Sequence, residues 1–129
     1  MDPSTAPPDR LPLAAGSVLH FAEAQDLVSR IPAHAQDPQS VFVETRARAL
    51  LAAIVFAYAR VGHLAYNAPL RDLDPQWGAD AWRILAELGE NEAADVIAAV
   101  QQEPTGTIHR LYHGVNQLLA TSGWDQTGP

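Results

Sequence analysis

Two histidines in the C-terminal part of the chain, His109 and His113, have a spacing that could bind a metal ion. In a helix, side chains four residues apart lie on the same side, and helical metal sites use this spacing. No glutamate follows His109 directly and the nearest acids in the sequence are remote, so a third ligand is missing. We therefore expect no metal site. The pair supports only an alternative interpretation, a metal-dependent helical enzyme.

Other kinds of catalysis lack the residues that they need. The chain has no cysteine, and its eight basic residues are all arginine, which excludes thiolate chemistry, a phosphate-loop lysine and a Schiff base. The acid pairs Asp72 with Asp74 and Glu90 with Glu92 are better explained by helix capping and solvation than by a shared pocket. No serine has the flanking glycines of a nucleophile elbow. We expect a protein that is not an enzyme and needs no cofactor.

Three arginines, Arg46, Arg48 and Arg60, lie in the segment that we expect to form the central helix. Glu44 precedes Arg48 by four residues, a spacing that favours an exposed ion pair on the helix surface. These arginines are either ordinary surface residues or a face that docks an acidic partner or a phosphate backbone. We keep them as candidate partner-binding residues.

A tryptophan is a further candidate for partner binding. Trp77 belongs to the apolar stripe of a predicted helix, whereas Trp82 falls outside that stripe, five residues further on. Tryptophans of this kind often anchor protein interfaces. The alternative is that Trp82 packs under a neighbouring loop.

The distribution of charge indicates what kind of partner fits. The net charge is −7, and residues 61–129 hold three arginines against nine acids. Because a reader of duplex DNA gathers basic residues on one face, direct DNA binding is disfavoured. A protein or peptide, basic in character, fits better. No signal peptide is recognisable, and the longest uncharged run, residues 49–59, is far shorter than the roughly 20 residues of a membrane span, so we expect a cytoplasmic chain.

The longest apolar segment spans residues 42–62 and carries large hydrophobic residues on more than one helical face. Asp37 followed by Pro38 is typical of an N-cap and a first helical residue, and Gly62 is typical of a C-cap. The segment has two adjacent stripes, which consist of Val43, Ala47, Leu50, Leu51, Ile54, Tyr58 and Val61, and of Phe42, Ala49, Ala53 and Phe56. Since a helix that is apolar on two sides lies inside a domain, we expect a central core helix over about 38–61.

Helices are also predicted before and after this segment. Ser17 would cap the first helix, and Pro32 would stop it. Asp74 with Pro75 repeats the cap-and-proline pattern and would open a third helix, which Gly89 would close. The apolar stripe of this third helix is Trp77, Ala81, Ile84, Leu85 and Leu88.

Two more helices complete the prediction. One covers about 91–102 and precedes the breakers Pro104 and Gly106. Thr107 would cap the last helix, and Gly123 would end it. Its apolar stripe is Ile108, Leu111, Tyr112, Val115, Leu118 and Leu119.

No run alternates apolar and polar residues over the length of a strand, so the fold class is all-α. We expect a compact bundle of about five helices around the central one, because several connections are short. Residues 1–16 contain four prolines and are expected to be a disordered linker or tail. Residues 17–122 would form the helical domain, and residues 123–129 a flexible tail.

An aromatic residue and an acid are followed by an arginine-containing segment and a Leu/Ala-rich helix, at Phe42, Glu44, Arg46, Arg48, Leu50 and Leu51. This order resembles the helix that opens the all-α domain of type IV secretion coupling proteins, the membrane-anchored ATPases of conjugative DNA transfer. Residues 104–120 are similar to the turn and helix that end that domain. The family's nucleotide-binding domain and transmembrane helices are absent, so ATPase activity is not implied.

The resemblance implies a non-catalytic recognition domain that contacts the relaxosome, a relaxase or other protein substrates of type IV secretion. The main alternative is a small helical dimerisation or adaptor protein, which would form a tight homodimer. The metal-dependent enzyme built on His109 and His113 is the third interpretation.

Overall fold

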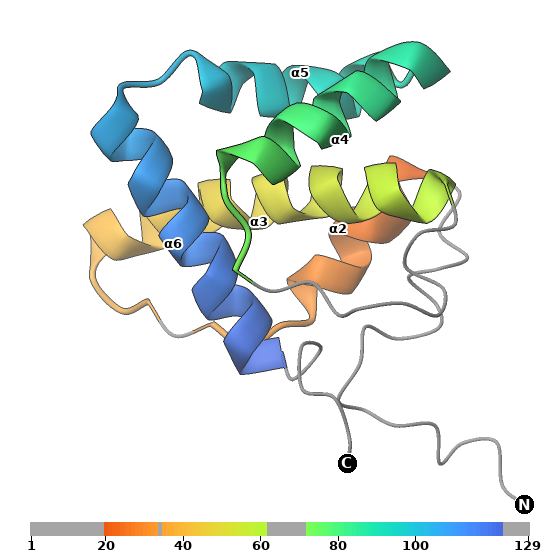
Figure 1. The fold of residues 1–129 in the computed structure, drawn as a ribbon. Helices are drawn as coiled ribbons and strands as arrows, with labels where there is room; N and C mark the ends of the chain where they lie inside the picture. Colours follow the sequence, from red (N-terminus) through yellow and green to blue (C-terminus); the bar gives the residue numbers. More distant parts are fainter. Residues whose placement is uncertain (1–19, 34, 62–71, 123–129) are drawn as a thin grey trace, which may run out of the picture.

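The computed structural model describes residues 20–33, 35–61 and 72–122. They form five helices and no strand, which confirms the all-α bundle. The helices are α2 (Phe21–Ser29), α3 (Pro38–Arg60), α4 (Pro75–Leu88), α5 (Asn91–Gln101) and α6 (Thr105–Ser122). In Figure 1, the antiparallel pair α4 and α5 lies on one side of α3, α2 lies on the other side, and α6 crosses the N-terminal half of α3.

Two helices begin as the sequence predicts. The side chain of Asp37 accepts a hydrogen bond from the backbone N–H of Ser40 at 2.9 Å, and Pro38 is the first residue of α3. Asp74 accepts from the N–H groups of Gln76 and Trp77 at the start of α4. In both places a carboxylate satisfies donors that have no partner within the helix. Two Asp-Pro pairs therefore fix the starts of α3 and α4, the helices that follow the two longest connections.

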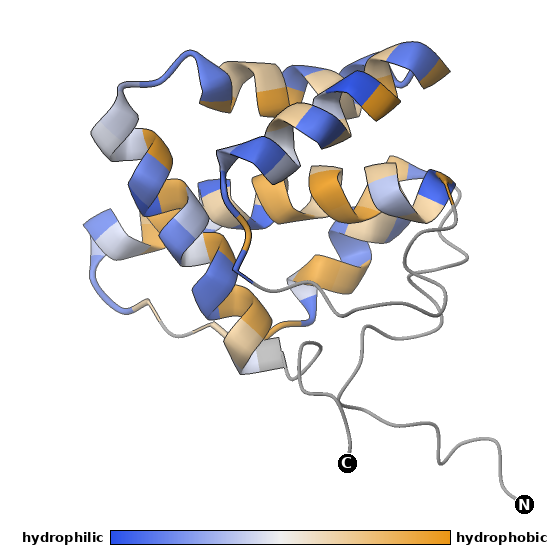
Figure 2. Ribbon diagram, viewed as in Figure 1, coloured by the Kyte–Doolittle hydropathy of each residue, from blue (hydrophilic) through white to orange (hydrophobic). Residues whose placement is uncertain are grey.

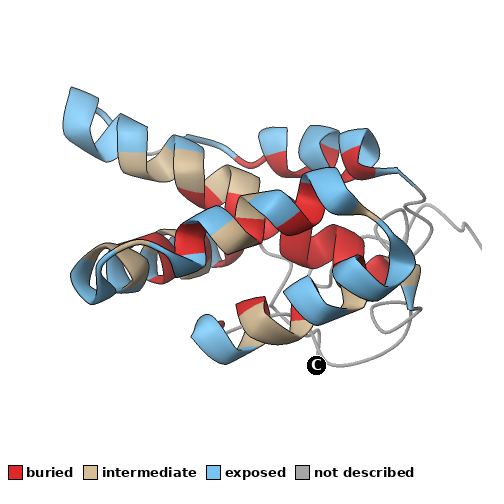
Figure 3. Cartoon of the chain, turned by 90° about the horizontal axis from the view of Figure 1, so that it is seen from above, coloured by how far each residue is buried: buried red, intermediate tan, exposed pale blue. Residues whose placement is uncertain are grey.

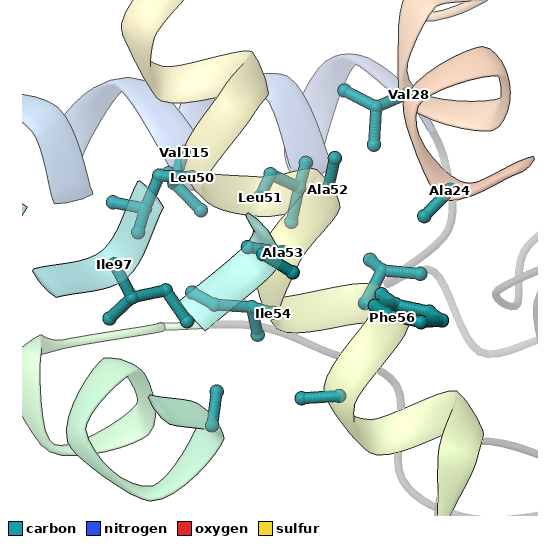
Figure 4. Close-up of a cluster of buried hydrophobic side chains, with 14 of the residues drawn as sticks. Ala24, Val28, Leu50, Leu51, Ala52, Ala53, Ile54, Phe56, Ile97 and Val115 are labelled. Atoms are coloured by element: carbon teal, nitrogen blue, oxygen red, sulfur yellow. The ribbon is translucent and has the colours of Figure 1, made fainter. Parts of the chain in front are cut away.

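The central helix α3 is enclosed along its C-terminal half. Every residue from Leu50 to Ala59 is buried, because α2, α4, α5 and α6 all pack against α3 (Figure 3). Figure 4 shows Phe56 of α3 on the side that faces Ala24 of α2. The ring of Phe56 stacks on that of Phe21, with 5.8 Å between the centroids. The uncharged run in the sequence thus becomes the core of the domain (Figure 2).

Both ends of the predicted apolar stripes on α3 are exposed, contrary to our expectation. Phe42 is 62% exposed and Val61 is 52% exposed. The apolar stripes extend beyond the part of α3 against which other helices pack. Sequence periodicity cannot show where that packed part ends. Leu88, at the end of the α4 stripe, is exposed for the same reason. Val61 is also the C-cap of α3, next to the predicted C-cap Gly62, which lies outside the described residues.

Two helix starts differ from prediction. His20, not Ser17, is the N-cap of α2, and the carboxylate of Glu23 accepts the N–H of His20 at 2.9 Å. The last helix, α6, begins at Thr105, so Thr107 lies inside it and is not its cap. Pro104 precedes α6 directly, and its carbonyl accepts the N–H of Ile108, so the chain is helical immediately after the proline.

Several predictions concern residues outside the described ranges. They are the tails at 1–16 and 123–129 and the closing glycines at 62 and 123. Within the ranges that are described, no helix has both the length and the apolar character needed to cross a membrane.

Candidate functional site

The guanidinium group of Arg48 holds the end of α2. It donates to the carbonyl oxygen of Val28 at 2.9 Å and pairs with Glu44 at 3.2 Å. Glu44 also accepts the N–H of Ala35 at 3.2 Å, in the connection between α2 and α3. The predicted Glu44–Arg48 pair is confirmed, but it is largely buried rather than exposed. Arg48 therefore joins three segments of the fold.

The other two candidate arginines on α3 contact other elements. Arg46 pairs with Glu103, just before α6, at 2.8 Å, and its guanidinium lies 6.0 Å from the centre of the Phe42 ring. Arg60 forms an ion pair with Glu90, in the turn between α4 and α5. All three arginines thus hold α3 to neighbouring parts of the domain. They do not gather on one exposed face.

The helices α4 and α5 form a hairpin whose turn is fixed by Gly89 and Glu90. Gly89 has a φ of 76°, a left-handed conformation that a residue with a Cβ rarely adopts. The N–H of Glu90 donates to the carbonyl of Leu85 at 2.9 Å, and the carboxylate of Glu90 reaches Arg60. A glycine cap and one ion pair therefore set the direction of α5.

This hairpin carries most of the net negative charge. It contains five acids and one arginine, Arg83, which pairs with Asp80 at 3.0 Å. Glu87, Glu92 and Asp95 are exposed and form no ion pair with any part of the chain that the structure describes. We call these three residues the hairpin acids. They are the charges of the hairpin that remain available to a partner.

Trp82 is 40% exposed on α4, within the same hairpin. The sequence prediction that it lies off the apolar stripe of α4 is consistent with this position. Trp77, on the stripe, is half-buried and packs edge to face on Tyr58 of α3, with 5.3 Å between the ring centroids. The two tryptophans of α4 therefore have different environments, one in the core margin and one at the surface.

The candidate histidines His109 and His113 are both exposed on α6. Across the described ranges, no group of three or more His, Asp or Glu side chains is arranged to hold a metal ion. His113 instead borders a groove of about 670 Å³ between the start of α3 and the middle of α6. From α6 the groove receives Arg110, His113, Gly114 and Gln117. The chain segment over residues 35–44 forms the opposite wall.

Two features that position these surfaces were not found by sequence reasoning. The side-chain amide of Asn116 on α6 accepts the N–H of Leu73 at 2.8 Å and donates to its carbonyl at 2.9 Å. The phenol of Tyr112 lies against Gly78, where a Cβ would be 1.9 Å from the phenol oxygen. An asparagine within an apolar helical stripe and a glycine within a helix are both unfavourable for helix formation. These two residues were the signals in the sequence for the two contacts, because a residue that disfavours a helix often occurs there to make a specific tertiary contact.

Burial changes the acidity of Tyr112. Because the phenolate would have to form away from water, burial raises the pKa of Tyr112 to about 12, and the negative charge of Asp74 acts in the same direction. Burial also raises the pKa of Tyr58. Neither tyrosine lines the groove, and burial is the main cause of both pKa shifts, so the shifts reflect packing.

Comparison of the chain with protein-family models, with curated proteins and with solved structures gives no match.

Proposed function

We propose that this chain is a non-catalytic recognition domain that binds a basic protein or peptide through the α4–α5 hairpin. The observation that carries the proposal is that one hairpin holds both an exposed tryptophan, Trp82, and the three exposed hairpin acids, which have no ion pair within the described part of the chain. An aromatic side chain supplies contact area, and exposed carboxylates attract arginine and lysine.

The alternative surface, the arginines of α3, supports partner binding less well. Arg46, Arg48 and Arg60 already have carboxylate partners within the domain. To bind an acidic partner, each would first have to break an internal ion pair, which lowers any net gain in affinity. The hairpin acids have no such competing contact, so a basic partner meets them directly.

This proposal fits the role implied by the resemblance to the all-α domain of type IV secretion coupling proteins. In that role the partner is a relaxase, another relaxosome protein or a secreted substrate that presents a basic segment, and the encounter takes place in the cytoplasm. The negative surface of the hairpin also makes direct binding to DNA phosphates unfavourable.

The test is a titration of the purified chain with a fluorescently labelled basic secretion-signal peptide of a relaxase, followed by polarisation at several salt concentrations. We expect saturable binding that weakens as salt rises, because salt screens exposed charges. A peptide with glutamate in place of each arginine and lysine should not bind. Binding that is absent at low ionic strength, or equal for both peptides, would contradict the proposal.

Variants locate the surface. Trp82→Ala and the triple variant Glu87→Gln, Glu92→Gln, Asp95→Asn should each weaken binding about ten-fold or more. The matched control is Phe42→Ala, which removes an aromatic ring that is more exposed than Trp82 but lies on α3. It should leave the affinity unchanged.

Sedimentation equilibrium of the free chain separates this proposal from the adaptor alternative, since a tight homodimer that covers Trp82 would overturn it.

A further inference from the structure

The groove between α3 and α6 is a second, separate place where this domain could bind a ligand. Its volume of about 670 Å³ lies within the roughly 300–1,000 Å³ that is usual for small-molecule sites. No residue of α4 or α5 lines it. Binding in the groove and binding at the hairpin can therefore be measured independently.

The groove exists because α3 and α6 cross at two small residues. A Cβ on Gly114 would lie 3.1 Å from the Cβ of Ala47 and 3.9 Å from a methyl group of Val43. The two helices are thus in contact at this point, which Figure 1 shows as the crossing of α6 over the N-terminal half of α3. Beyond the crossing, the first turns of α3 and the connection before them enclose the open space.

The two acids that line the groove already have partners within the chain. Asp37 caps α3 through the N–H of Ser40, and this hydrogen bond lowers the pKa of Asp37, so its carboxylate stays ionised. Glu44 pairs with Arg48 and accepts the N–H of Ala35. These contacts hold both acids in place. The two acids make that wall unfavourable for a ligand with several negative charges.

The α6 wall is different, because its polar groups have no partner among the residues that the structure describes. Arg110 forms no ion pair and no hydrogen bond there, and the same is true of His113, three residues further along the helix. The amides of Gln39 and Gln117, one on each wall, are also without a partner in the described ranges. The groove therefore offers one available cation together with neutral hydrogen-bonding groups.

We propose that the groove binds a small organic monocarboxylate that also carries hydroxyl or amide groups. Its carboxylate is held by the guanidinium of Arg110, a geometry that allows two parallel hydrogen bonds. The imidazole of His113 and the amides of Gln39 and Gln117 hydrogen-bond the polar groups. The apolar surface of Val43 and Gly114 contacts the carbon skeleton. We specify a single carboxylate because the carboxylate of Asp37 repels further negative charge, whereas that of Glu44 is already paired with Arg48.

The test uses gluconate, a monocarboxylate with five hydroxyl groups, as the probe in an NMR titration of the full chain. Backbone amide signals of Ser40, Gly114 and Gln117 should shift saturably with gluconate. Glucose, which matches its size and hydroxyl groups but is uncharged, should leave them in place. Citrate should bind more weakly than gluconate because of the fixed acids. Equal responses to gluconate and glucose, stronger binding of citrate, or no saturable shift in the groove would each overturn the proposal.

A pair of matched variants assigns the effect to Arg110. Arg110→Gln removes the cation from an exposed helical position, and gluconate should then bind about ten-fold more weakly or not at all. Arg83→Gln removes an exposed arginine from α4, outside the groove, and gluconate binding should not change. Unchanged binding in Arg110→Gln, with the same signals shifted, would contradict the assignment. Circular dichroism checks that both variants keep the helical content of the parent.

Discussion

The central helix and the α4–α5 hairpin both carry charged side chains, but they use them differently. Arg46, Arg48 and Arg60 on α3 form ion pairs inside the domain, whereas the hairpin acids point to solvent without a partner in the described part of the chain. The difference follows from position. Two other segments bring a carboxylate to α3, at Glu90 and Glu103, and the third carboxylate, Glu44, belongs to α3 itself. The hairpin acids instead lie at exposed positions of α4 and α5. Charge that is enclosed stabilises the fold, and charge that is left outside is available for recognition.

The largest expected effect on the free energy of unfolding concerns an ion-paired arginine of α3. Arg48→Ala removes the hydrogen bond to the carbonyl of Val28 and leaves the largely buried Glu44 without its guanidinium partner. We expect the free energy of unfolding to fall by about 2–3 kcal/mol, less than for a fully buried pair because water reaches part of the site. Urea denaturation measures it.

The control for this prediction is Arg83→Ala, which breaks an ion pair of the exposed type on α4. Its effect on the free energy of unfolding should stay below about 0.5 kcal/mol. If both variants lose the same stability, the distinction between enclosed and exposed charge fails.

The next effect concerns pH and the contact between the hairpin and α6. The pKa of Tyr112 is about 12 in the folded protein against an ordinary value of 10.0, so the folded state holds this proton more tightly. Stability from this group is complete below pH 10 and is lost as pH rises through 12, by about 2 kcal/mol. In Tyr112→Phe, the free energy of unfolding should therefore fall less between pH 9 and pH 11.5 than in the parent protein. Urea midpoints at the two pH values measure the difference. An identical alkaline loss in both proteins would show that Tyr112 is not responsible.

A smaller effect tests how the hairpin is attached to the core. In Gly78→Ala the new Cβ would overlap the phenol oxygen of Tyr112, and the buried ring must shift. Because alanine also favours the helix, we expect a net loss of about 1–2 kcal/mol in the free energy of unfolding. Adding Tyr112→Phe should recover much of it, since the next ring atom lies 3.2 Å from the Cβ position. Strict additivity of the two substitutions in a double-mutant cycle would contradict the contact.

The matched control for Gly78→Ala is Gly106→Ala, in the first turn of α6. A Cβ there meets no atom within 4 Å. Thermal unfolding should show equal or slightly higher stability for this variant, by up to about 0.5–1 kcal/mol. A loss like that of Gly78→Ala would mean that any added methyl group harms these helices.

The smallest effect tests the charge left outside. The triple variant Glu87→Gln, Glu92→Gln, Asp95→Asn should change the free energy of unfolding by no more than about 0.5 kcal/mol, because no ion pair is lost. The same variant is expected to lose most of its affinity for a basic peptide. A large change in the free energy of unfolding, measured by urea denaturation, would show that the hairpin acids stabilise the fold instead.

Much of the fold could be predicted from local sequence. Three helix caps depend only on the backbone next to them, so they can be predicted without knowledge of the tertiary structure. They are formed by Asp37 with Pro38, by Asp74 with Pro75, and by Gly89. The errors lie where the outcome depends on distant elements. Phe42 continues an apolar pattern, yet its exposure depends on which helices extend far enough to cover it.

The surfaces were harder to predict than the helices. Glu44 and Arg48 are neighbours on α3 and could be paired from their spacing, but the carbonyl of Val28 that Arg48 also binds comes from another helix. The partners of Arg46 and Arg60, at Glu103 and Glu90, are far away in the sequence. Spacing alone could not show that these arginines are engaged.

The two hydrogen bonds between Asn116 and the backbone of Leu73 make the backbone amide of Leu73 a reporter of the packing between α6 and the start of α4. Leu73 is buried, and its N–H can exchange with solvent only when α6 moves away from the start of α4. The exchange rate of this single proton therefore measures how often the bundle opens between these two helices. A ligand that closes the groove beside α6 would slow that rate even though it touches neither residue.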